Sequence, residues 1–250
     1  AAEGADVAMV ARTSEPGGPL GGSLAETAAR IARHGGRVTV IVADLAKDGA
    51  ASKLVRDAGD VDVLVANAAL PGTGRLDSFT HEEVARALRV NLESPIMMAR
   101  ELEPHFAKKG AGHIVFIASL AGKVGSPRSS IYNATKFGLR GFAFGLREDL
   151  HPYGAGVSLV SPGFVREAGT FHDAGSRQPP GLGTTTPKKV SQAVIEAIRR
   201  DRLEFTVAPR RQRLIAEVGY RHPRIASRVQ RGGGADKIAD KLAARQSDKR

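Results

Sequence analysis

The stretch from Ser119 to Lys136 reads SLAGKVGSPRSSIYNATK and decides how the rest of the chain is interpreted. Tyr132 and Lys136 stand four residues apart in a segment that continues FGLRGFAFGLREDL. If that segment is helical, the two side chains share one face, with Cβ atoms about 5 to 6 Å apart. A phenol with the ordinary pKa of about 10 is a weak acid-base catalyst at neutral pH, but a nearby ammonium group lowers that pKa. Tyr132 is therefore a candidate proton donor to a carbonyl or acceptor from an alcohol.

Ser119 follows the apolar run HIVFIA at residues 113–118, which predicts a buried strand. That order places the hydroxyl of Ser119 at the carboxyl end of the strand, where ligands bind in open α/β sheets. A Tyr-x-x-x-Lys pair alone decides little, because so short a motif also arises by chance. A serine at a strand end, thirteen residues before such a pair, is much more specific.

Two turns extend this combination: Asn67-Ala68-Ala69 follows the preceding predicted strand, and Pro162-Gly163 follows the next one. Together these motifs resemble the short-chain dehydrogenase/reductase family, over about residues 5–208. The resemblance implies an α/β fold with a Rossmann-type doubly wound parallel sheet and helices on both faces. It also implies an oxidoreductase that transfers hydride between NADP(H) and a carbonyl or secondary alcohol.

The resemblance assigns catalytic roles to four side chains. Ser119 would bond the substrate oxygen, Tyr132 would exchange the proton, and Lys136 would lower the pKa of Tyr132 and bind the nicotinamide ribose. Asn91 lies among apolar positions with helical spacing, so its amide needs partners. In the family, an asparagine in a Val-Asn sequence such as this one helps hold a water that relays protons from the lysine; the alternative is a satisfied core amide.

Cofactor contacts are expected at the ends of the strands, in addition to Tyr132 and Lys136. Arg12 follows the strand predicted over residues 5–11 with no acid beside it, which favours NADP over NAD, since an arginine there accommodates the 2′-phosphate. Arg12 as a plain polar strand end is the alternative. The remaining expected cofactor residues are Asp44 and Leu45 beside the adenine, Asn67 at its turn, and Pro162, Gly163 and Val165 against the nicotinamide. Asp44 is also a candidate N-cap for the following helix, and Asn67 a candidate for bonding neighbouring backbone.

A complete member of this family begins with a strand and a Gly-rich turn that meets the pyrophosphate. Residues 1–5 instead resemble the end of the helix that follows that turn. In the strand order 3-2-1-4-5-6, the absent strand belongs between the strands predicted at 6–11 and 61–66. We expect either that about 25 to 30 residues of a longer protein, one βα unit, are absent, or that this chain closes its sheet abnormally.

The other elements follow from capping, periodicity and turn residues. Ser23 and Glu26 form a capping-box pattern at the start of a helix over 23–34. Gly138, Gly141 and Gly145 indicate close packing of their helix, inside the chain or across a subunit boundary. Further predictions are strands over 38–43, 157–160 and 203–208, helices over 80–107 and 187–200, and a lid over 171–186.

Composition bounds the class of protein. The 250 residues fit one oxidoreductase domain over residues 1–208 and a basic helical tail over 209–250. The net charge is +11, of which +9 falls in residues 199–250. A basic tail attracts acidic partners, nucleic acid or an anionic membrane, and its broken amphipathic pattern suits covering the substrate site or peripheral membrane contact. A solvated positive face is the plainer interpretation.

The chain has no cysteine, which excludes disulfides and thiolate metal sites, and no metal site is expected. No apolar run is long enough to span a bilayer, and no leader pattern opens the sequence. We expect a cytoplasmic location, a small hydrophobic substrate and a homodimer or homotetramer.

Two alternatives come from other classes. A non-catalytic binding or scaffold protein would explain the missing Gly-rich turn, although packing alone does not require the four candidate catalytic side chains together. A nucleic-acid binder would explain the basic tail, but Tyr220 is the only aromatic residue after Phe205, which argues against a stacking platform.

Overall fold

The structure is a computed structural model that describes residues 1–13, 23–169, 181–232 and 235–246. The chain forms two compact units, Ala1–Val61 and Asp62–Arg250, and each is described by itself. The boundary lies within the segment that the sequence assigns to one domain, and the tail belongs to the second unit.

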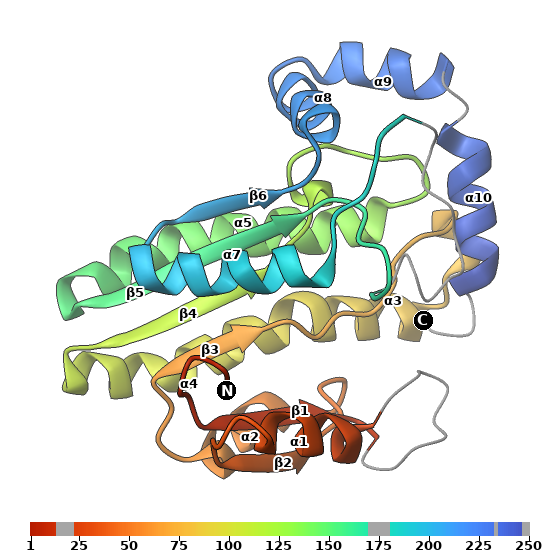
Figure 1. The fold of residues 1–250 in the computed structure, drawn as a ribbon. Coiled ribbons are helices and arrows are strands. Elements are labelled where there is room, and N and C mark those ends of the chain that lie inside the picture. The colour runs from red at the N-terminus through yellow and green to blue at the C-terminus, as the bar shows by residue number, and fades with distance from the viewer. Residues whose placement is uncertain (14–22, 170–180, 233–234, 247–250) are drawn as a thin grey trace. The chain divides into compact units, whose positions relative to one another are not determined.

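The first unit is built on two parallel strands. Strand β1 (Val7–Ala11) pairs with β2 (Val38–Val42), so that Val7 lies beside Val38. Helices α1 (Leu24–Ala32) and α2 (Ala50–Ala58) complete the unit (Figure 1). The predicted capping box is present: the Ser23 hydroxyl accepts from the Glu26 amide at 3.1 Å, and the Glu26 carboxylate accepts from the Ser23 amide at 3.1 Å.

The second unit contains a four-stranded parallel sheet in the order β3-β4-β5-β6. The two middle strands are the most buried, and in β5 every residue is buried. The bounds are β3 Val63–Ala66, β4 Gly112–Ile117, β5 Ala155–Pro162 and β6 Glu204–Val207. The strand predicted over 157–160 is thus longer at both ends.

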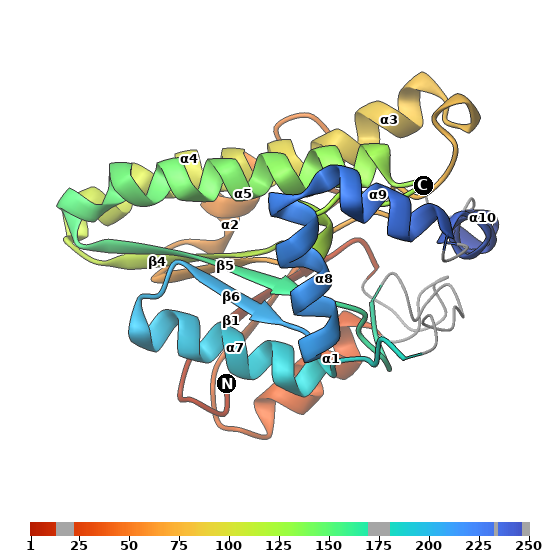
Figure 2. The ribbon, with the colours of Figure 1, turned by 90° about the horizontal axis from the view of Figure 1, so that it is seen from above.

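Helices cover both faces of this sheet. Figure 2 shows α4 and α5 on one face and α7 on the other. Val115 and Val160 form a core cluster with Ala197 of α7, while Phe116 meets Phe142 of α5 edge to face, with ring centroids 5.7 Å apart. The bounds are α3 His81–Leu88, α4 Ser94–Lys109, α5 Ser130–Leu150 and α7 Pro187–Arg200, with short 3-10 turns η1 Leu76–Ser78, η3 Leu120–Gly122 and η4 His151–Tyr153.

The described strands form two separate ladders, and their neighbours are those that the expected order assigns. The fold is therefore the predicted Rossmann-type α/β fold, without a ladder between β1 and β3 among the described residues.

The single helix predicted over residues 80–107 is interrupted. A π-helical turn, η2 (Arg89–Glu93), joins α3 to α4 and contains the buried Asn91. Such wider turns often occur at functional sites. Periodicity alone missed the turn because one extra residue in the helical repeat leaves the apolar spacing on either side unchanged.

The C-terminal tail is helical, as predicted. Helices α8 (Arg210–Arg221), α9 (Pro223–Gly232) and α10 (Ala235–Gln246) follow β6, and α8 packs against α9. No helix among the described residues is long and apolar enough to cross a membrane.

Candidate active site

Ser119 lies at the carboxyl end of β4, as its sequence context predicts. It caps the short η3 turn, where its Oγ accepts from the Ala121 amide at 3.1 Å. The backbone of Ser119 is extended, so the chain leaves the sheet edge before it turns.

Tyr132 and Ser119 come together across this edge. Tyr132 is on the first turn of α5, close enough to Ser119 for that hydroxyl to act on the pKa of the phenol. Burial raises the pKa of Tyr132 above its ordinary value of 10.0, and Ser119 opposes that shift. The phenol is thus protonated at neutral pH and held near the hydroxyl that we expect to bind substrate.

Lys136 stands one turn further along α5, as the spacing predicts. Its side chain is buried, at 2% exposure for the residue, and Nζ donates to the Ile117 carbonyl at 2.9 Å. Nζ lies 5.7 Å from the centre of the Tyr132 ring. Burial lowers the pKa of Lys136 from 10.5 to about 8.

The electrostatic relationship differs from the expected one. We expected the ammonium of Lys136 to lower the pKa of Tyr132, but burial dominates and raises it, with Ser119 as the only opposing group. The physical reason is that removing an ionisable phenol from water disfavours its charged form.

A close backbone approach sets the position of Lys136. Gly122, at the end of η3, lies so near α5 that a Cβ there would be 2.7 Å from the Lys136 carbonyl oxygen. Asn133 adds three bonds between α5 and the same loop: its Nδ2 donates to the carbonyls of Ala121 and Val124 at 2.6 and 2.9 Å, and its Oδ1 accepts from the Ser126 amide at 3.2 Å.

Asn91 is satisfied entirely by backbone. Its Oδ1 accepts from the Leu70 amide at 2.7 Å and its Nδ2 donates to the Leu70 carbonyl at 2.9 Å, at zero exposure. The side chain therefore fills the role of a bonded core amide and fixes the segment after β3. The proton relay through Asn91 stays a prediction.

Four expected cofactor residues lie in the second unit with the Tyr132 and Lys136 pair. Asn67 directly follows β3 and is exposed, while Pro162 ends β5 and Gly163 continues from it. Val165 and Thr185 form an isolated parallel β-bridge, so the beginning and the end of the loop between β5 and α7 are paired. The predicted lid falls largely on residues 170–180, which lie outside the described residues.

The other three expected cofactor residues are in the first unit. Arg12 directly follows β1 and is exposed, and Leu45 is buried. The Asp44 carboxylate accepts from the Ala46 amide at 3.0 Å. Asp44 as an N-cap is wrong, because α2 begins at Ala50 with Gly49 in the cap position; Asp44 instead closes a local turn.

Gln212 is a positioning residue that the sequence analysis missed. From α8, its Oε1 accepts from the Phe164 amide at 3.2 Å, and its Nε2 donates to the carbonyls of Leu182 and Gly183 at 3.2 and 2.7 Å. A Cβ on Gly163 would be 2.0 Å from that Oε1 and 2.9 Å from the Cβ of Ala208, so a larger residue here would displace the Gln212 side chain. The sequence does hold a signal for this residue. Gln212 lies on the same face of the helix as the small residues Ala216 and Gly219, and a polar amide on a buried helical face needs bonding partners.

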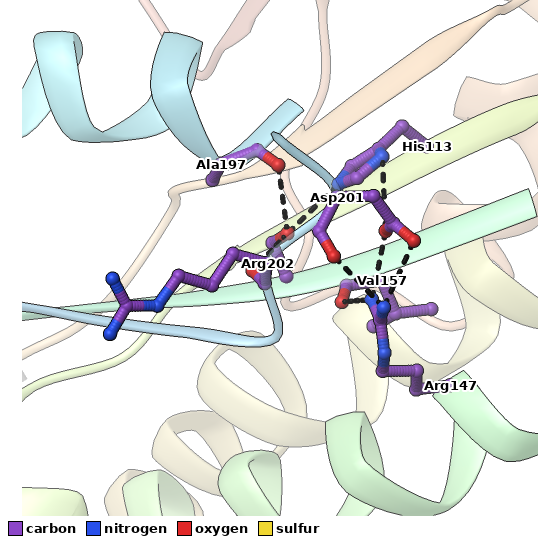
Figure 3. A network of polar contacts seen from close by, with 7 residues as sticks. His113, Arg147, Val157, Ala197, Asp201 and Arg202 are labelled. Carbon is purple, nitrogen blue, oxygen red and sulfur yellow. Dashed lines mark hydrogen bonds and ion pairs between the residues drawn. The ribbon is translucent and has the colours of Figure 1, made fainter. Parts of the chain in front are cut away.

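A second polar cluster lies toward the amino ends of β4 and β6 (Figure 3). The His113 Nε2 is 2.9 Å from the Ser158 Oγ, and Nδ1 is 3.9 Å from the Asp201 carboxylate. Arg147 donates to both Asp201 oxygens at 2.8 and 2.9 Å and to the Val157 carbonyl at 2.9 Å.

Ser158, His113 and Asp201 do not form a catalytic triad, because Ser158 is not activated as a nucleophile. Ser158 is fully buried and its hydroxyl donates to the Arg202 carbonyl at 2.8 Å, so it accepts from His113. Nε2 then carries the proton, and Nδ1 is left without a hydrogen to donate to Asp201. Burial lowers the pKa of His113, which keeps the ring neutral at neutral pH. The cluster joins α7, α5 and the sheet structurally.

Comparison with known proteins identifies the family. Residues 1–178 match the family model described as short chain dehydrogenase. The chain belongs to the short-chain dehydrogenase family. Among its curated relatives is the ketoacyl reductase HetN of Nostoc sp., which is 31% identical over 229 residues, 88% of this chain and 80% of that protein.

Solved short-chain dehydrogenases share the fold. A metagenomic short-chain oxidoreductase in complex with NADP matches with a TM-score of 0.68 and 28% identity, over 83% of this chain and 87% of that one. A short-chain dehydrogenase from Sphingobium yanoikuyae in complex with NADPH matches with a TM-score of 0.73 and 26% identity, over 90% and 87%. As a member of this family, the protein is an oxidoreductase.

The residues of this short-chain dehydrogenase fit an organic cofactor. Among the described residues, no group of three or more His, Cys, Asp or Glu side chains could hold a metal ion. The Tyr132 hydroxyl and the Lys136 ammonium supply the donors that a ribose diol needs. The set can hold a polar oxygen at Ser119 and transfer a proton to it.

Proposed function

We propose that the chain transfers hydride between NADP(H) and a carbonyl or secondary-alcohol group of a small, predominantly hydrophobic substrate. The observation that carries this proposal is the meeting of Ser119, at the carboxyl end of β4, with Tyr132 on the first turn of α5 and the buried Lys136 one helical turn further along. The bound nicotinamide would supply the hydride chemistry, and the protein would supply orientation and the proton.

Each side chain has a distinct task. The Ser119 hydroxyl bonds the substrate oxygen, and the phenol of Tyr132 donates its proton to that oxygen as the carbonyl is reduced. The raised pKa of Tyr132 suits a group that must be protonated before it acts as an acid. Lys136 binds the ribose hydroxyls through Nζ, and Asn91 holds the Leu70 backbone in place.

The proposed cofactor choice is NADP(H) over NAD(H). Arg12 is exposed directly after β1, next to the hydroxyl of Thr13. A guanidinium bonds phosphate through two donors at once, which suits the 2′-phosphate. The two relatives solved with NADP or NADPH support this choice. Asp44, Leu45, Asn67, Pro162, Gly163 and Val165 are the further proposed contacts.

Tyr132→Phe tests the proposal, with Tyr153→Phe as its control because Tyr153 is an exposed phenol on η4. NADPH oxidation is followed with a panel of apolar ketones and a β-ketoacyl ester, the last chosen because one relative is named a ketoacyl reductase. Tyr132→Phe should lower kcat by about 100- to 10,000-fold, the usual contribution of a positioned acid, while NADPH fluorescence titration and circular dichroism stay at parental values.

Two results would overturn the assignment. A Tyr132→Phe variant that keeps most of its kcat would remove the proton donor from the mechanism. A parent protein that includes the Gly-rich turn and binds no NADPH would favour a non-catalytic binding protein with this fold. The Tyr153→Phe control should match the parent in every measurement.

A further inference from the structure

Helix α8 has two faces of opposite character. Its inward face carries Gln212, Ala216 and Gly219, all buried, and the backbone of Gly219 lies against Val124 of the loop after Ser119. Its outward face carries Leu214, which is 65% exposed. The helix is thus held by one side to the loops around the candidate active site.

Exposed apolar residues occur on both α8 and α9. Leu214, Ile215 and Val218 are spaced so that they share one side of α8, and all three are exposed. Ile225 on α9 is 50% exposed, and α9 contacts α8 and leaves its end in a different direction, as Figures 1 and 2 show. We call these four residues the apolar α8/α9 face.

Exposed arginines flank these residues in the sequence. Residues 210–228 contain six arginines and one glutamate, a net charge of +5. All six side chains are exposed: Arg210, Arg211, Arg213, Arg221, Arg224 and Arg228. The glutamate, Glu217, is already paired with Arg221 at 2.9 Å. Exposed apolar residues flanked by cations are the pattern of helices that lie in the surface of an anionic bilayer.

We propose that α8 and α9 dock on an anionic membrane surface, with the apolar α8/α9 face among the lipid chains and the arginines at the headgroups. Arginine suits this position because its long apolar stem can lie along the hydrocarbon while its charged head stays in water. The proposal does not depend on the reaction that the chain catalyses.

Charge argues against other occupants. A second copy placed on the same face by two-fold symmetry would bring six arginines against six more, with one glutamate on each side to offset them. Single-stranded nucleic acid would satisfy the arginines but needs stacking surfaces. The aromatic residue of α8, Tyr220, is instead stacked with the Arg140 guanidinium, 5.4 Å from the ring centre.

The test is co-sedimentation of the purified chain with vesicles of phosphatidylcholine alone and of equal parts phosphatidylcholine and phosphatidylglycerol. We expect binding to the anionic vesicles that weakens with salt, and little binding to the neutral ones. Arg224→Ser with Arg228→Ser should lower the binding constant roughly thirtyfold, which is about 1 kcal/mol for each basic side chain. Leu214→Ser with Val218→Ser should lower it about tenfold or more, since apolar burial is lost.

The control variant carries Lys188→Ser and Lys189→Ser, which remove two exposed cations from the start of α7. It should bind as the parent does. Circular dichroism shows whether each variant is folded, and none of the substituted residues is part of the candidate active site.

Three results would overturn the proposal. The first is a parent that does not bind anionic vesicles. The second is a control variant that loses as much binding as Arg224→Ser with Arg228→Ser. The third is a Leu214→Ser with Val218→Ser variant that binds as the parent does, which would mean that charge attraction alone causes the binding. Size-exclusion chromatography tests the alternative of a second copy. If the parent does not bind vesicles and Leu214→Ser with Val218→Ser lowers the mass of the particle in solution, the face is an interface between two copies of the chain.

Discussion

The ammonium of Lys136 donates to the carbonyl of Ile117, the last residue of β4, across 2.9 Å. This bond ties α5 to the strand that leads to Ser119, so the helix and the strand hold the candidate active site in one geometry. It also leaves a buried cation with a lowered pKa.

Lys136 should make the free energy of unfolding depend on pH in the alkaline range. Its pKa is about 8 in the folded chain, against 10.5 when exposed. Between these values the unfolded state binds the additional proton, so the free energy of unfolding rises with pH, by about 3 kcal/mol across the interval. Below pH 8 both states are protonated and this contribution is constant.

Urea unfolding of the parent and of Lys136→Met at pH 8 and pH 10.5 measures that rise. The variant should lack it, and Lys189→Met, which removes an exposed lysine of α7, should retain it. Parallel pH dependence in the parent and Lys136→Met would show that Lys136 is not the group responsible.

Gln212 should control the turn that we expect to hold the nicotinamide. Gln212→Glu keeps the size of the side chain but cannot donate to the carbonyls of Leu182 and Gly183. Leaving a buried partner unsatisfied costs about 1 to 3 kcal/mol, so KM for NADPH should rise about tenfold, with a much smaller change in kcat.

Steady-state kinetics with varied NADPH tests this effect, and Gln192→Glu is the control because Gln192 is exposed on α7. A Gln212→Glu variant that loses thermal stability but keeps its KM would give Gln212 a purely structural role.

The cluster around Asp201 should support stability without affecting catalysis. Arg147→Met removes both bonds to the Asp201 carboxylate and the bond to the Val157 carbonyl. Hydrogen bonds to charged groups contribute about 1.5 to 3 kcal/mol net, so the free energy of unfolding should fall by about 2 to 3 kcal/mol. The kcat/KM should stay within about twofold, because the cluster is not at the carboxyl ends of the strands where Ser119 lies.

Arg100→Met is the matched control for denaturant unfolding, since Arg100 pairs with Glu101 at 3.1 Å while 69% exposed. Surface substitutions of this kind usually change stability by less than about 0.5 kcal/mol. Equal losses in the two variants would mean that the Arg147 network contributes no more than a surface ion pair.

Arg12 should carry much of the cofactor preference. A hydrogen-bonded charged contact contributes about 1.5 to 3 kcal/mol, or roughly ten- to a hundredfold. The parent should prefer NADP(H) by that factor, and Arg12→Ala should lose it by weakening NADP(H) while sparing NAD(H). The measurement is kcat/KM with both cofactors, on a chain that includes the Gly-rich turn. An unchanged ratio in the variant would leave Arg12 as a polar strand end.

Local patterns in the sequence were sufficient for most elements. The Ser23 and Glu26 capping box, the α7 bounds and the strand before Ser119 need only neighbouring residues, and each was predicted and found. Gly138 packs against Leu92 inside the chain, but a Cβ on Gly141 or Gly145 would meet nothing within 4 Å. Glycine spacing indicated close packing without identifying which glycine has a neighbour.

The sequence by itself determined the family, the order of the elements and the helical face shared by Tyr132 and Lys136, because these depend on residue types and short spacings. Only the tertiary structure decided the protonation of that pair, since burial depends on what surrounds a side chain rather than on its neighbours in sequence. It also decided the π-helical turn at Asn91 and the bonds of Gln212 to residues 164, 182 and 183. The bonds of Gln212 join segments about 30 to 50 residues apart, and no local pattern encodes them.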